Sequence, residues 1–335
     1  MSGALNITGE GGQAALWADV AEPAPTFELM MRHDRPFLIV CLGVGRDSTA
    51  LLALLKKKGI RPDAIFFADT RGEKFQTYEY IAILSAWLRA HDFPPITIIR
   101  HENGKRDEGL EGQMLRLGTI PSVAFNKKSA SCSDTWKQSP QKARAKQLPG
   151  AQASFKRNRR VVFAIGYEAD ECDRVKRSDT YNAANPSRYF VNWFPLVEEG
   201  VGLAGCIELI LDAGLPLPLK SACFFCPSSK VAEIIWLAEH HPGLFMRALI
   251  MEARAMPKLT KLKGLGGRAF RWRDLPCAQP FLAEVDRIVA EMPPTESRET
   301  AQTSTRLRGA IERVLAIDDD EARGVQEAGT LALAA

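Results

Sequence analysis

The sequence predicts an α/β fold, in which a parallel twisted sheet flanked by helices is followed by a mainly helical C-terminal part. Three observations support this prediction. Short apolar runs alternate with segments of helical periodicity between residues 36 and 200, a glycine-rich turn joins the first run to the first helix, and only helical periodicity continues afterwards. Apolar runs without alternation are typical of strands covered on both faces, as in a Rossmann-like parallel sheet.

The expected elements follow the chain in order. The strands are expected at 37–42, 63–69, 96–101, 159–167 and 188–196. The helices between them are expected at 47–58, at 73–92 and over most of 105–148. Because strands separated by helices form right-handed βαβ units, the strands should be parallel. Further helices are expected at 201–214, 228–239, 241–255 and 280–291.

This pattern divides the chain into four parts. Residues 1–34 form an arm, 35–200 the α/β domain, and 201–295 a helical, cysteine-bearing part packed on it. Residues 296–335 are expected to form one surface helix followed by a disordered tail, because the acidic run "DDDE" and the small residues after it offer little apolar surface to bury.

Composition is that of a soluble globular protein, with 46% hydrophobic and 25% charged residues among 335. No apolar run approaches the roughly 18–20 residues that a membrane-spanning helix needs. The N-terminus lacks the basic start and apolar core of a signal peptide. We therefore expect a cytoplasmic protein without a membrane partner.

The net charge of +4 is unevenly distributed along the chain. Segment 127–160 has ten Lys or Arg residues against one acid, and segment 257–273 has six basic residues and no acid. Such stretches are either solvated surface or a binding surface for a polyanion, namely a nucleotide, DNA or RNA.

The first expected strand ends in a turn that consists of Gly43, Val44, Gly45, Arg46, Asp47 and Ser48. Asp47 and Ser48 are good N-cap residues for the helix that follows. A strand–turn–helix unit directs backbone N–H groups and the positive end of a helix dipole at an anion such as phosphate. The spacing argues against a P-loop and against a dinucleotide fingerprint. Taken alone, the turn could also be purely structural.

Seven cysteines in a chain without a secretory signal do not favour a disulfide scaffold. Four of them stand in loop-like settings near prolines or basic residues, and these are Cys132, Cys223, Cys226 and Cys277. Two of the four form a C-x-x-C motif. Four thiolates suit either structural Zn²⁺ or a [4Fe–4S] cluster.

Four segments together resemble the phosphoadenosine phosphosulfate (PAPS) reductase-like family of the adenine nucleotide α-hydrolase superfamily. The glycine turn resembles the family's S-G-G-x-D-S, and Asp69 with Thr70 resembles its D-T signature after the second strand. "CSDTWKQSP", with Cys132 and Lys137, resembles its cysteine and Lys-x-x-Pro segment. "GYEADECDR" resembles its segment after the fourth strand.

In that last segment Gly166 and Glu171 match the family's pattern, whereas Arg174 is displaced by one position. The turn also departs from the pattern, because Gly43 replaces a serine and Val44 replaces a glycine. One hydroxyl donor to phosphate is therefore missing. The resemblance covers roughly residues 35–230 and depends on the order and spacing of the segments.

The resemblance implies that ATP is split to AMP and pyrophosphate with Mg²⁺ while a substrate oxygen becomes adenylated. It implies catalytic roles for Asp47, which contacts Mg²⁺ or caps the helix, and for Lys137 and Glu171. It implies nucleotide contacts from the turn and from Asp69, Thr70, Gly166 and Arg174. A sulfur nucleophile could then displace the activated oxygen, which implies a sulfur donor such as a cysteine desulfurase.

Members of the family include iron–sulfur sulfonucleotide reductases and the ATP-pyrophosphatase component of DNA phosphorothioation systems. The resemblance therefore favours an iron–sulfur cluster over zinc. Thiol-dependent reductases use a nucleophilic cysteine in a C-terminal tail, and residues 318–335 contain none. The features are thus nearest to the phosphorothioation component or to tRNA thiolation. A PAPS or adenosine phosphosulfate reductase, and a non-catalytic nucleotide- or nucleic-acid-binding module, remain the alternatives.

Overall fold

The computed structural model describes residues 24–101, 108–121, 132–171, 173–176, 178, 187–300 and 302–334. Most of the expected arm, and the start of the first basic segment at 127–131, lie outside these ranges. Within these ranges the structure has five strands, which are β1 (Leu38–Leu42), β2 (Ala64–Asp69), β3 (Ile96–Arg100), β4 (Val161–Ile165) and β5 (Phe190–Trp193). All five expected strands are thereby confirmed.

The strands form one parallel sheet in the order β3-β2-β1-β4-β5. Val40 of β1 lies opposite Ile65 of β2 on one side and Ala164 of β4 on the other. The chain thus moves outward from β1 first in one direction and then in the other. In such sheets the crevice beyond the carboxyl ends of the two strands at this reversal, here β1 and β4, is the usual ligand site.

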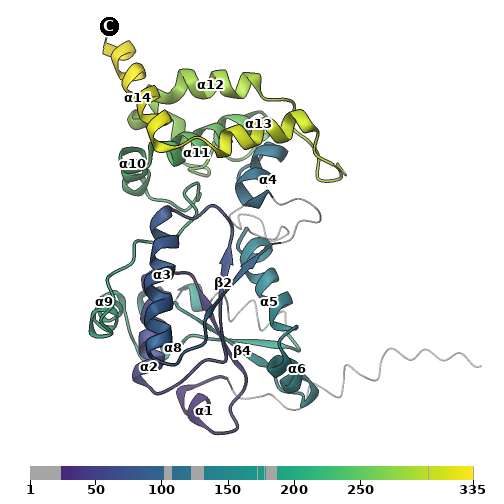
Figure 1. Ribbon diagram of the computed structural model, residues 1–335, viewed down its shortest axis with the longest axis vertical. Coiled ribbons are helices and arrows are strands. Elements are labelled where there is room, and N and C mark those ends of the chain that lie inside the picture. Colours follow the sequence, from purple (N-terminus) through teal and green to yellow (C-terminus); the bar gives the residue numbers. More distant parts are fainter. Residues whose placement is uncertain are drawn as a thin grey trace, which may run out of the picture.

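Helices cover both faces of the sheet (Figure 1). One face packs against α1 (Phe27–Met31), α2 (Arg46–Lys57), α3 (Phe75–Ala90) and α9 (Leu203–Asp212), and the opposite face packs against α5 (Ser139–Ala145) and α6 (Pro149–Lys156). Successive residues of β1 point to opposite faces, so that Val40 joins the first core and Ile39 the second. Both faces of β1 therefore need apolar residues, and the predicted α/β class is confirmed.

Packing contacts cross the division expected at residue 200 in both directions. Helix α9 lies beyond this position but packs directly against α2, and α8 (Pro195–Glu198) lies beside it. In the other direction, α4 (Gly109–Leu117) belongs to the expected α/β domain but packs against α11 (Pro242–Ala255) and α13 (Thr305–Leu315). Helix α9 therefore belongs to the core of the sheet, and α4 belongs to the core of the C-terminal helices.

The C-terminal part is helical, as expected, and is gathered around α11, in which every residue except Arg247 is buried. Around it lie α10 (Val231–His240), α12 (Leu282–Glu291), α13 and α14 (Asp319–Ala334), with the short helices η4 (Met256–Lys258), η5 (Trp272–Asp274) and η6 (Pro276–Phe281). Figure 1 shows this layer beyond one end of the sheet. Within the described ranges, no helix combines the length and the apolar character required to cross a membrane.

The expectation of a disordered tail was wrong, because residues 319–334 form helix α14. Asp319, Asp320 and Glu321 occupy its first turn, where negative charge interacts favourably with the helix dipole. The Asp319 carboxylate also accepts a hydrogen bond from the backbone N–H of Gly243 at 2.9 Å. Ala322 is fully buried. The acidic run is therefore a helix start docked on α11.

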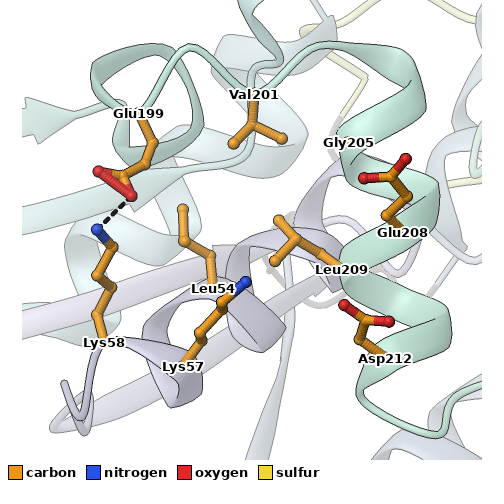
Figure 2. A pocket seen from close by; sticks show the side chains of 9 residues that line it. All are labelled: Leu54, Lys57, Lys58, Glu199, Val201, Gly205, Glu208, Leu209 and Asp212. Carbon is orange, nitrogen blue, oxygen red and sulfur yellow. Dashed lines mark ion pairs between the residues drawn. The ribbon is translucent and has the colours of Figure 1, made fainter.

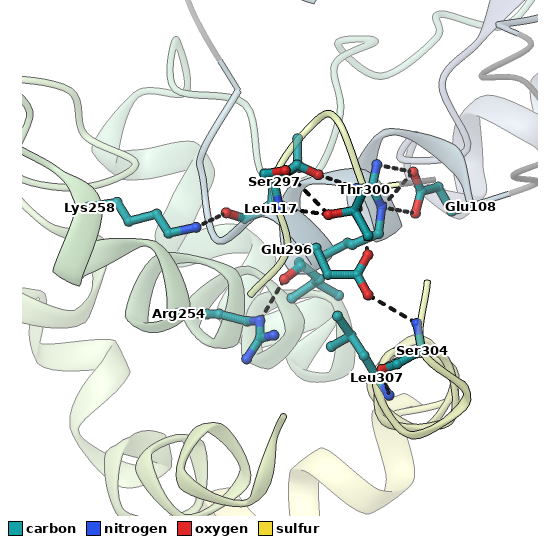
Figure 3. Close-up of polar contacts among 11 residues, drawn as sticks. Glu108, Leu117, Arg254, Lys258, Glu296, Ser297, Thr300, Ser304 and Leu307 are labelled. Carbon is teal, nitrogen blue, oxygen red and sulfur yellow. Dashed lines mark hydrogen bonds and ion pairs between the residues drawn. The ribbon is translucent and has the colours of Figure 1, made fainter. Parts of the chain in front are cut away.

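Polar contacts attach α4 to the C-terminal part (Figure 3). Arg254 donates to the carbonyl oxygen of Leu115 at 2.5 Å, and Lys258 donates to that of Leu117 at 2.6 Å. Both carbonyls lie at the carboxyl end of α4, where cations are favoured. This explains why a helix between β3 and β4 packs with helices more than a hundred residues later.

Candidate active site

The glycine turn after β1 leads directly into α2. Gly45 is the N-cap, and among the described residues no side chain caps the first turn of the helix. The expectation that Asp47 or Ser48 caps the helix was wrong, because the helix already begins at Arg46; the Ser48 hydroxyl donates instead to the carbonyl oxygen of Gly45 at 3.1 Å. The first backbone N–H groups of α2 therefore have no side-chain acceptor, as an anion site requires.

Val44 has a φ of 61° and is 1% exposed. This is the left-handed region, which is unfavourable for a β-branched residue and favours glycine. The surrounding turn must therefore hold Val44 in place, since backbone strain of this kind persists only where the neighbouring structure imposes it.

The segment after β4 lies against the start of α2. A Cβ atom on Gly166 would lie 2.8 Å from the carbonyl carbon of Asp47 and from the Cα of Ser48, so only glycine allows this approach. Glu171 forms a two-oxygen ion pair with Arg174, with distances of 2.7 and 2.8 Å. The predicted residues of both segments are thus brought together at the crevice between β1 and β4.

Two further residues join Asp47 in this crevice and were not identified from the sequence. One oxygen of Asp47, one oxygen of Glu168 and the sulfur of Cys206 all lie within 4.8 Å of one another. Arg46 pairs with Asp47 at 2.9 Å and with Glu168 at 3.4 Å. Glu168 is 8% exposed, and its Oε2 is buried without a hydrogen-bond partner among the described residues.

Burial changes the titration of these three groups. It raises the pKa of Asp47 against the opposing effect of Arg46. It also raises the pKa of Glu168, to which the negative charge of Asp47 contributes. The pKa of the Cys206 thiol is raised to about 12, again mainly by burial. The crevice therefore disfavours uncompensated negative charge, which is the condition under which a cation binds well.

Asp69 and Thr70, at the end of β2, are both buried and bonded within the protein. The Asp69 carboxylate accepts from the Arg71 backbone N–H and the Tyr78 hydroxyl, both at 2.8 Å, and from Arg100 at 3.1 Å. The Thr70 hydroxyl lies 3.1 Å from the sulfur of Cys223. Asp69 therefore orders the turn after β2, and Thr70 faces the C-x-x-C segment.

The C-x-x-C segment is held between the turn after β2 and the glycine turn. Cys223 forms an isolated antiparallel bridge with Glu73, and the backbone N–H of Phe224 donates to the carbonyl oxygen of Gly72 at 2.8 Å. On the other side, the Ser221 hydroxyl donates to the carbonyl oxygen of Gly43. One loop thus touches both the expected nucleotide turn and the cysteine site.

Cys226 acts electrostatically on two of the other predicted cysteines, Cys132 and Cys223. Burial raises the pKa of Cys132 and of Cys223, and the charge of Cys226 raises both further. Burial also raises the pKa of Cys277, at the start of η6, and the negative charge of Glu239 raises it further. All four pack against the same hydrophobic core.

The distances between the predicted cysteine sulfurs indicate which type of metal centre they suit. A tetrahedral Zn²⁺ with Zn–S bonds of about 2.3 Å requires sulfurs about 4 Å apart. Within the described ranges, no three of the predicted cysteines bring their sulfurs within 4.8 Å of one another. The present spacing is therefore not that of a preformed zinc tetrahedron, whereas a cluster is larger and holds its ligands further apart.

Lys137 lies beside these thiols, in the π-helix η2 (Asp134–Gln138). Its ammonium is 3.2 Å from Oε1 of Glu73, a carboxylate that the sequence did not single out. Burial lowers the pKa of Lys137, but the charges of Glu73 and Cys223 outweigh this and raise it above its usual value. Lys137 therefore stays positively charged next to the thiols.

The two basic segments occupy different parts of the molecule. The described part of the first contributes α5 and α6, with Arg144, Lys146, Lys156 and Arg157 exposed to solvent. The second packs against the C-terminal core through Leu265 and Trp272, and exposes Lys258, Lys261, Lys263 and Arg268. Both segments thus present cations at the surface.

A groove of about 280 Å³ lies at the far end of α2 from the glycine turn, between α2 and α9 (Figure 2). An ion pair between Lys58 and Glu199 crosses one side of it. The residues that line it are Leu54, Lys57, Lys58, Glu199, Val201, Gly205, Glu208, Leu209 and Asp212. None of these is a predicted site residue, so this groove is separate from the candidate active site.

No protein-family model and no curated protein matches the chain. Among solved structures, the fold is similar to PAPS reductase from Candida auris in its phosphate complex, with 15% identity and a TM-score of 0.34 over 64% of this chain and 92% of that one. It is also similar to the U34-tRNA thiolase NcsA from Methanococcus maripaludis with its [4Fe-4S] cluster, with 14% identity and a TM-score of 0.35 over 81% of this chain and 86% of that one.

Proposed function

We propose that this chain is an ATP-dependent adenylyl-transfer enzyme of the PAPS reductase-like family, which activates a nucleic-acid or nucleotide substrate for sulfur transfer. The single observation that carries the proposal is the uncapped start of α2 at the crevice between β1 and β4, in contact through Ser221 with the cysteine loop. An anion site and a thiol site in direct contact are what activation followed by sulfur transfer requires.

In this proposal the first N–H groups of α2 and the guanidinium of Arg46 bind the β- and γ-phosphates of ATP. A substrate oxygen attacks the α-phosphorus, a new P–O bond forms, and the bond to the bridging oxygen of pyrophosphate breaks. The same N–H groups and Arg46 stabilise the charge on the departing pyrophosphate without having to reorient. Glu171 and Arg174 close the crevice from the β4 side.

The Asp47 and Glu168 carboxylates would repel these phosphates unless a cation lay between them. Carboxylate oxygens are the ligands that Mg²⁺ prefers, and Oε2 of Glu168, which has no partner in the described part of the chain, is available as a ligand atom. Both residues therefore fit a Mg²⁺ ion, which when bound would neutralise charge on the phosphates. Asp47 is thus assigned to metal contact rather than to capping.

Cys132, Cys223 and Cys226 fit a thiolate-bound iron–sulfur cluster, with zinc as the alternative. Soft thiolates suit both metals, and the Lys137 ammonium offsets part of their negative charge. The cluster would provide a metal to which sulfur can bind during transfer. The exposed cations of the two basic segments support a polyanionic acceptor, DNA or RNA, and we propose a cysteine desulfurase as the sulfur donor.

The test is the product formed from ATP. Anaerobically purified protein is incubated with ATP and Mg²⁺, with and without transfer RNA or duplex DNA, and the nucleotides and pyrophosphate are quantified. AMP and pyrophosphate in equal amounts are expected, with a rate that falls about 100-fold in Asp47→Asn. Asp212→Asn, in the groove at the far end of α2, is the matched control and should leave the rate unchanged.

Other products would contradict the proposal in distinguishable ways. ADP as the sole product would exclude attack at the α-phosphorus. Sulfite released from PAPS with a thiol reductant would identify a sulfonucleotide reductase. ATP binding without any product would identify a non-catalytic module, in which Asp47→Asn changes affinity alone.

A further inference from the structure

Two aromatic side chains lie against each other at the carboxyl ends of β4 and β5. Tyr167 follows β4 by two positions, and Phe194 follows β5 directly. Their rings are stacked, with centroids 5.4 Å apart and planes inclined by 12°. Both residues are only partly buried. The pair therefore forms an accessible aromatic surface at the edge of the sheet where ligands bind in folds of this class.

The guanidinium of Arg174 adds a cation to this surface. Its Cζ lies 4.2 Å from the centroid of the Tyr167 ring, which is a cation–π contact. The same group donates to both oxygens of Glu171, at 2.7 and 2.8 Å. Because guanidinium N–H bonds lie in the plane of the group, Glu171 holds its edge and Tyr167 covers one of its faces. The side chain is 48% exposed, so the other face is available to a ligand.

This stack borders the proposed ATP site. The residue before Tyr167, Gly166, lies with its backbone against Asp47 at the start of α2. The residue after it, Glu168, pairs with Arg46 at 3.4 Å. In the five-stranded sheet that the structure describes, β5 is the outermost strand on this side. A long molecule can therefore reach the stack from beyond β5 while ATP occupies the crevice between β1 and β4.

We propose that an unpaired base of the acceptor nucleic acid stacks on the exposed face of the Arg174 guanidinium, with Tyr167 and Phe194 behind it. Aromatic rings and the planar guanidinium of arginine are the groups on which proteins stack unpaired bases. Bases inside a duplex are stacked on one another and present no free face. The inference rests on the proposed function, and it deepens that proposal by specifying a single-stranded segment as the substrate.

The experiment is a double-mutant cycle between Arg174 and the base, and it measures binding without ATP. Fluorescence anisotropy gives the affinity of the full chain for a short single strand, for the same strand without bases and for the corresponding duplex, over a range of salt concentrations. Arg174→Lys keeps the charge but loses the planar face. It should weaken binding of the complete single strand about tenfold, leave the other two affinities unchanged and leave the salt dependence as it is.

Two further variants test the ring behind the guanidinium. Tyr167→Leu should also weaken binding of the complete single strand alone. Tyr189→Leu is the matched control, because Tyr189 likewise has an arginine over its ring, Arg188 at 5.7 Å, but directly precedes β5 and so lies at the opposite edge of the sheet. It should leave all three affinities unchanged.

Several results would overturn the inference. Equal losses in Arg174→Lys for strands with and without bases would show a contact to phosphate, and the same loss for the duplex would exclude an unpaired base. A chain that binds no single strand has no such site. If a non-hydrolysable ATP analogue abolishes the effect of the bases, the adenine of ATP occupies the stack instead. Formation of AMP is measured separately: base-dependent binding without AMP contradicts only the proposed adenylyl transfer, and AMP without base-dependent binding contradicts only this inference.

Discussion

The hydroxyl of Ser221 donates a hydrogen bond to the carbonyl oxygen of Gly43, so the cysteine loop lies directly on the glycine turn. The contact continues at the next glycine, where a Cβ on Gly45 would lie 3.1 Å from the Cβ and 3.3 Å from the backbone nitrogen of Ser221. Two sites separated by almost 180 residues therefore share one interface. A substitution in the glycine turn should therefore also change the geometry of the cysteine site.

Gly45→Ala should consequently impair both sites. The added methyl group would lie too close to the Cβ and the backbone nitrogen of Ser221, neither of which can rotate away. This should displace the 221–226 loop and shift the N-cap of α2. We expect ATP affinity to fall about tenfold, which corresponds to about 1.4 kcal/mol, together with a lower metal content. Isothermal titration calorimetry and metal analysis measure the two effects.

Gly43→Ala is the control, since its Cβ would meet neighbouring atoms only at 3.6 and 3.9 Å, an ordinary contact. It should retain affinity and metal. A Gly45→Ala protein that loses ATP binding but keeps its full metal content would show that the two sites are not coupled through Ser221.

Val44 should reverse the usual order of stability between alanine and glycine variants. Removing buried carbons costs about 1.6 kcal/mol in Val44→Ala, which loses two, and about 2.4 kcal/mol in Val44→Gly, which loses three. Alanine retains the left-handed strain at φ 61°, whereas glycine relieves about 1–2 kcal/mol of it. We expect Val44→Gly to be less destabilised than Val44→Ala in urea unfolding. If Val44→Ala proves the more stable, the backbone at this position is not left-handed in solution.

The raised pKa values of Asp47 and Glu168 predict opposite pH effects on stability and on Mg²⁺ binding. Above the ordinary values near 3.8 and 4.5, the folded state holds these protons more tightly than the unfolded state does. Stability of the metal-free protein should therefore fall as pH rises through the folded pKa values. Mg²⁺ binding should strengthen over the same range, because protons compete with the metal.

Thermal unfolding with and without Mg²⁺, across a pH series from neutral to mildly acidic, measures both effects. Other buried carboxyls also titrate in this range, so the informative quantity is the difference from Glu168→Gln, which should flatten both dependences. A Mg²⁺-induced rise in Tm that is the same in Glu168→Gln and in the unsubstituted protein would exclude Glu168 as a ligand.

The sequence predicted those features of the fold that depend on local pattern. Both faces of a parallel strand are buried, so each of the five strands carries an apolar run, as β1 does with Val40 and Ile39 on opposite faces. The glycine turn could also be predicted, because the residues of a turn and of a helix start can be recognised from the local sequence. The cap was assigned wrongly since Asp47 and Ser48 both have capping side chains, whereas the helix begins earlier, at Arg46, with Gly45 as its N-cap.

The residues that the sequence missed act through contacts far along the chain. Glu73 meets Lys137 across 64 positions and Cys223 across 150, and Glu168 meets Arg46 across 122. No local pattern marks such carboxylates, because their environment exists only after folding. The same reason explains the error at the tail, where composition does not show the surface on which α14 docks.

The docking of α14 gives the last prediction, which compares two glycines of this helix. A Cβ on Gly329 would lie 1.9 Å from the carbonyl oxygen of Pro280, whereas a Cβ on Gly324 meets nothing within 4 Å. Gly324→Ala should therefore stabilise the protein by up to about 1 kcal/mol through helix propensity alone. Gly329→Ala gains the same propensity but must push the helix off η6, so we expect a net loss of about 1–3 kcal/mol.

Hydrogen exchange distinguishes this account from a general loss of stability. In Gly329→Ala the amides of α14 should lose protection while those of β1 and β2 keep theirs, because the sheet and the C-terminal helices belong to separate cores. In Gly324→Ala protection of α14 should increase. If both alanine variants stabilise the protein equally, α14 does not pack against Pro280, and its apolar residues would have to be covered in another way.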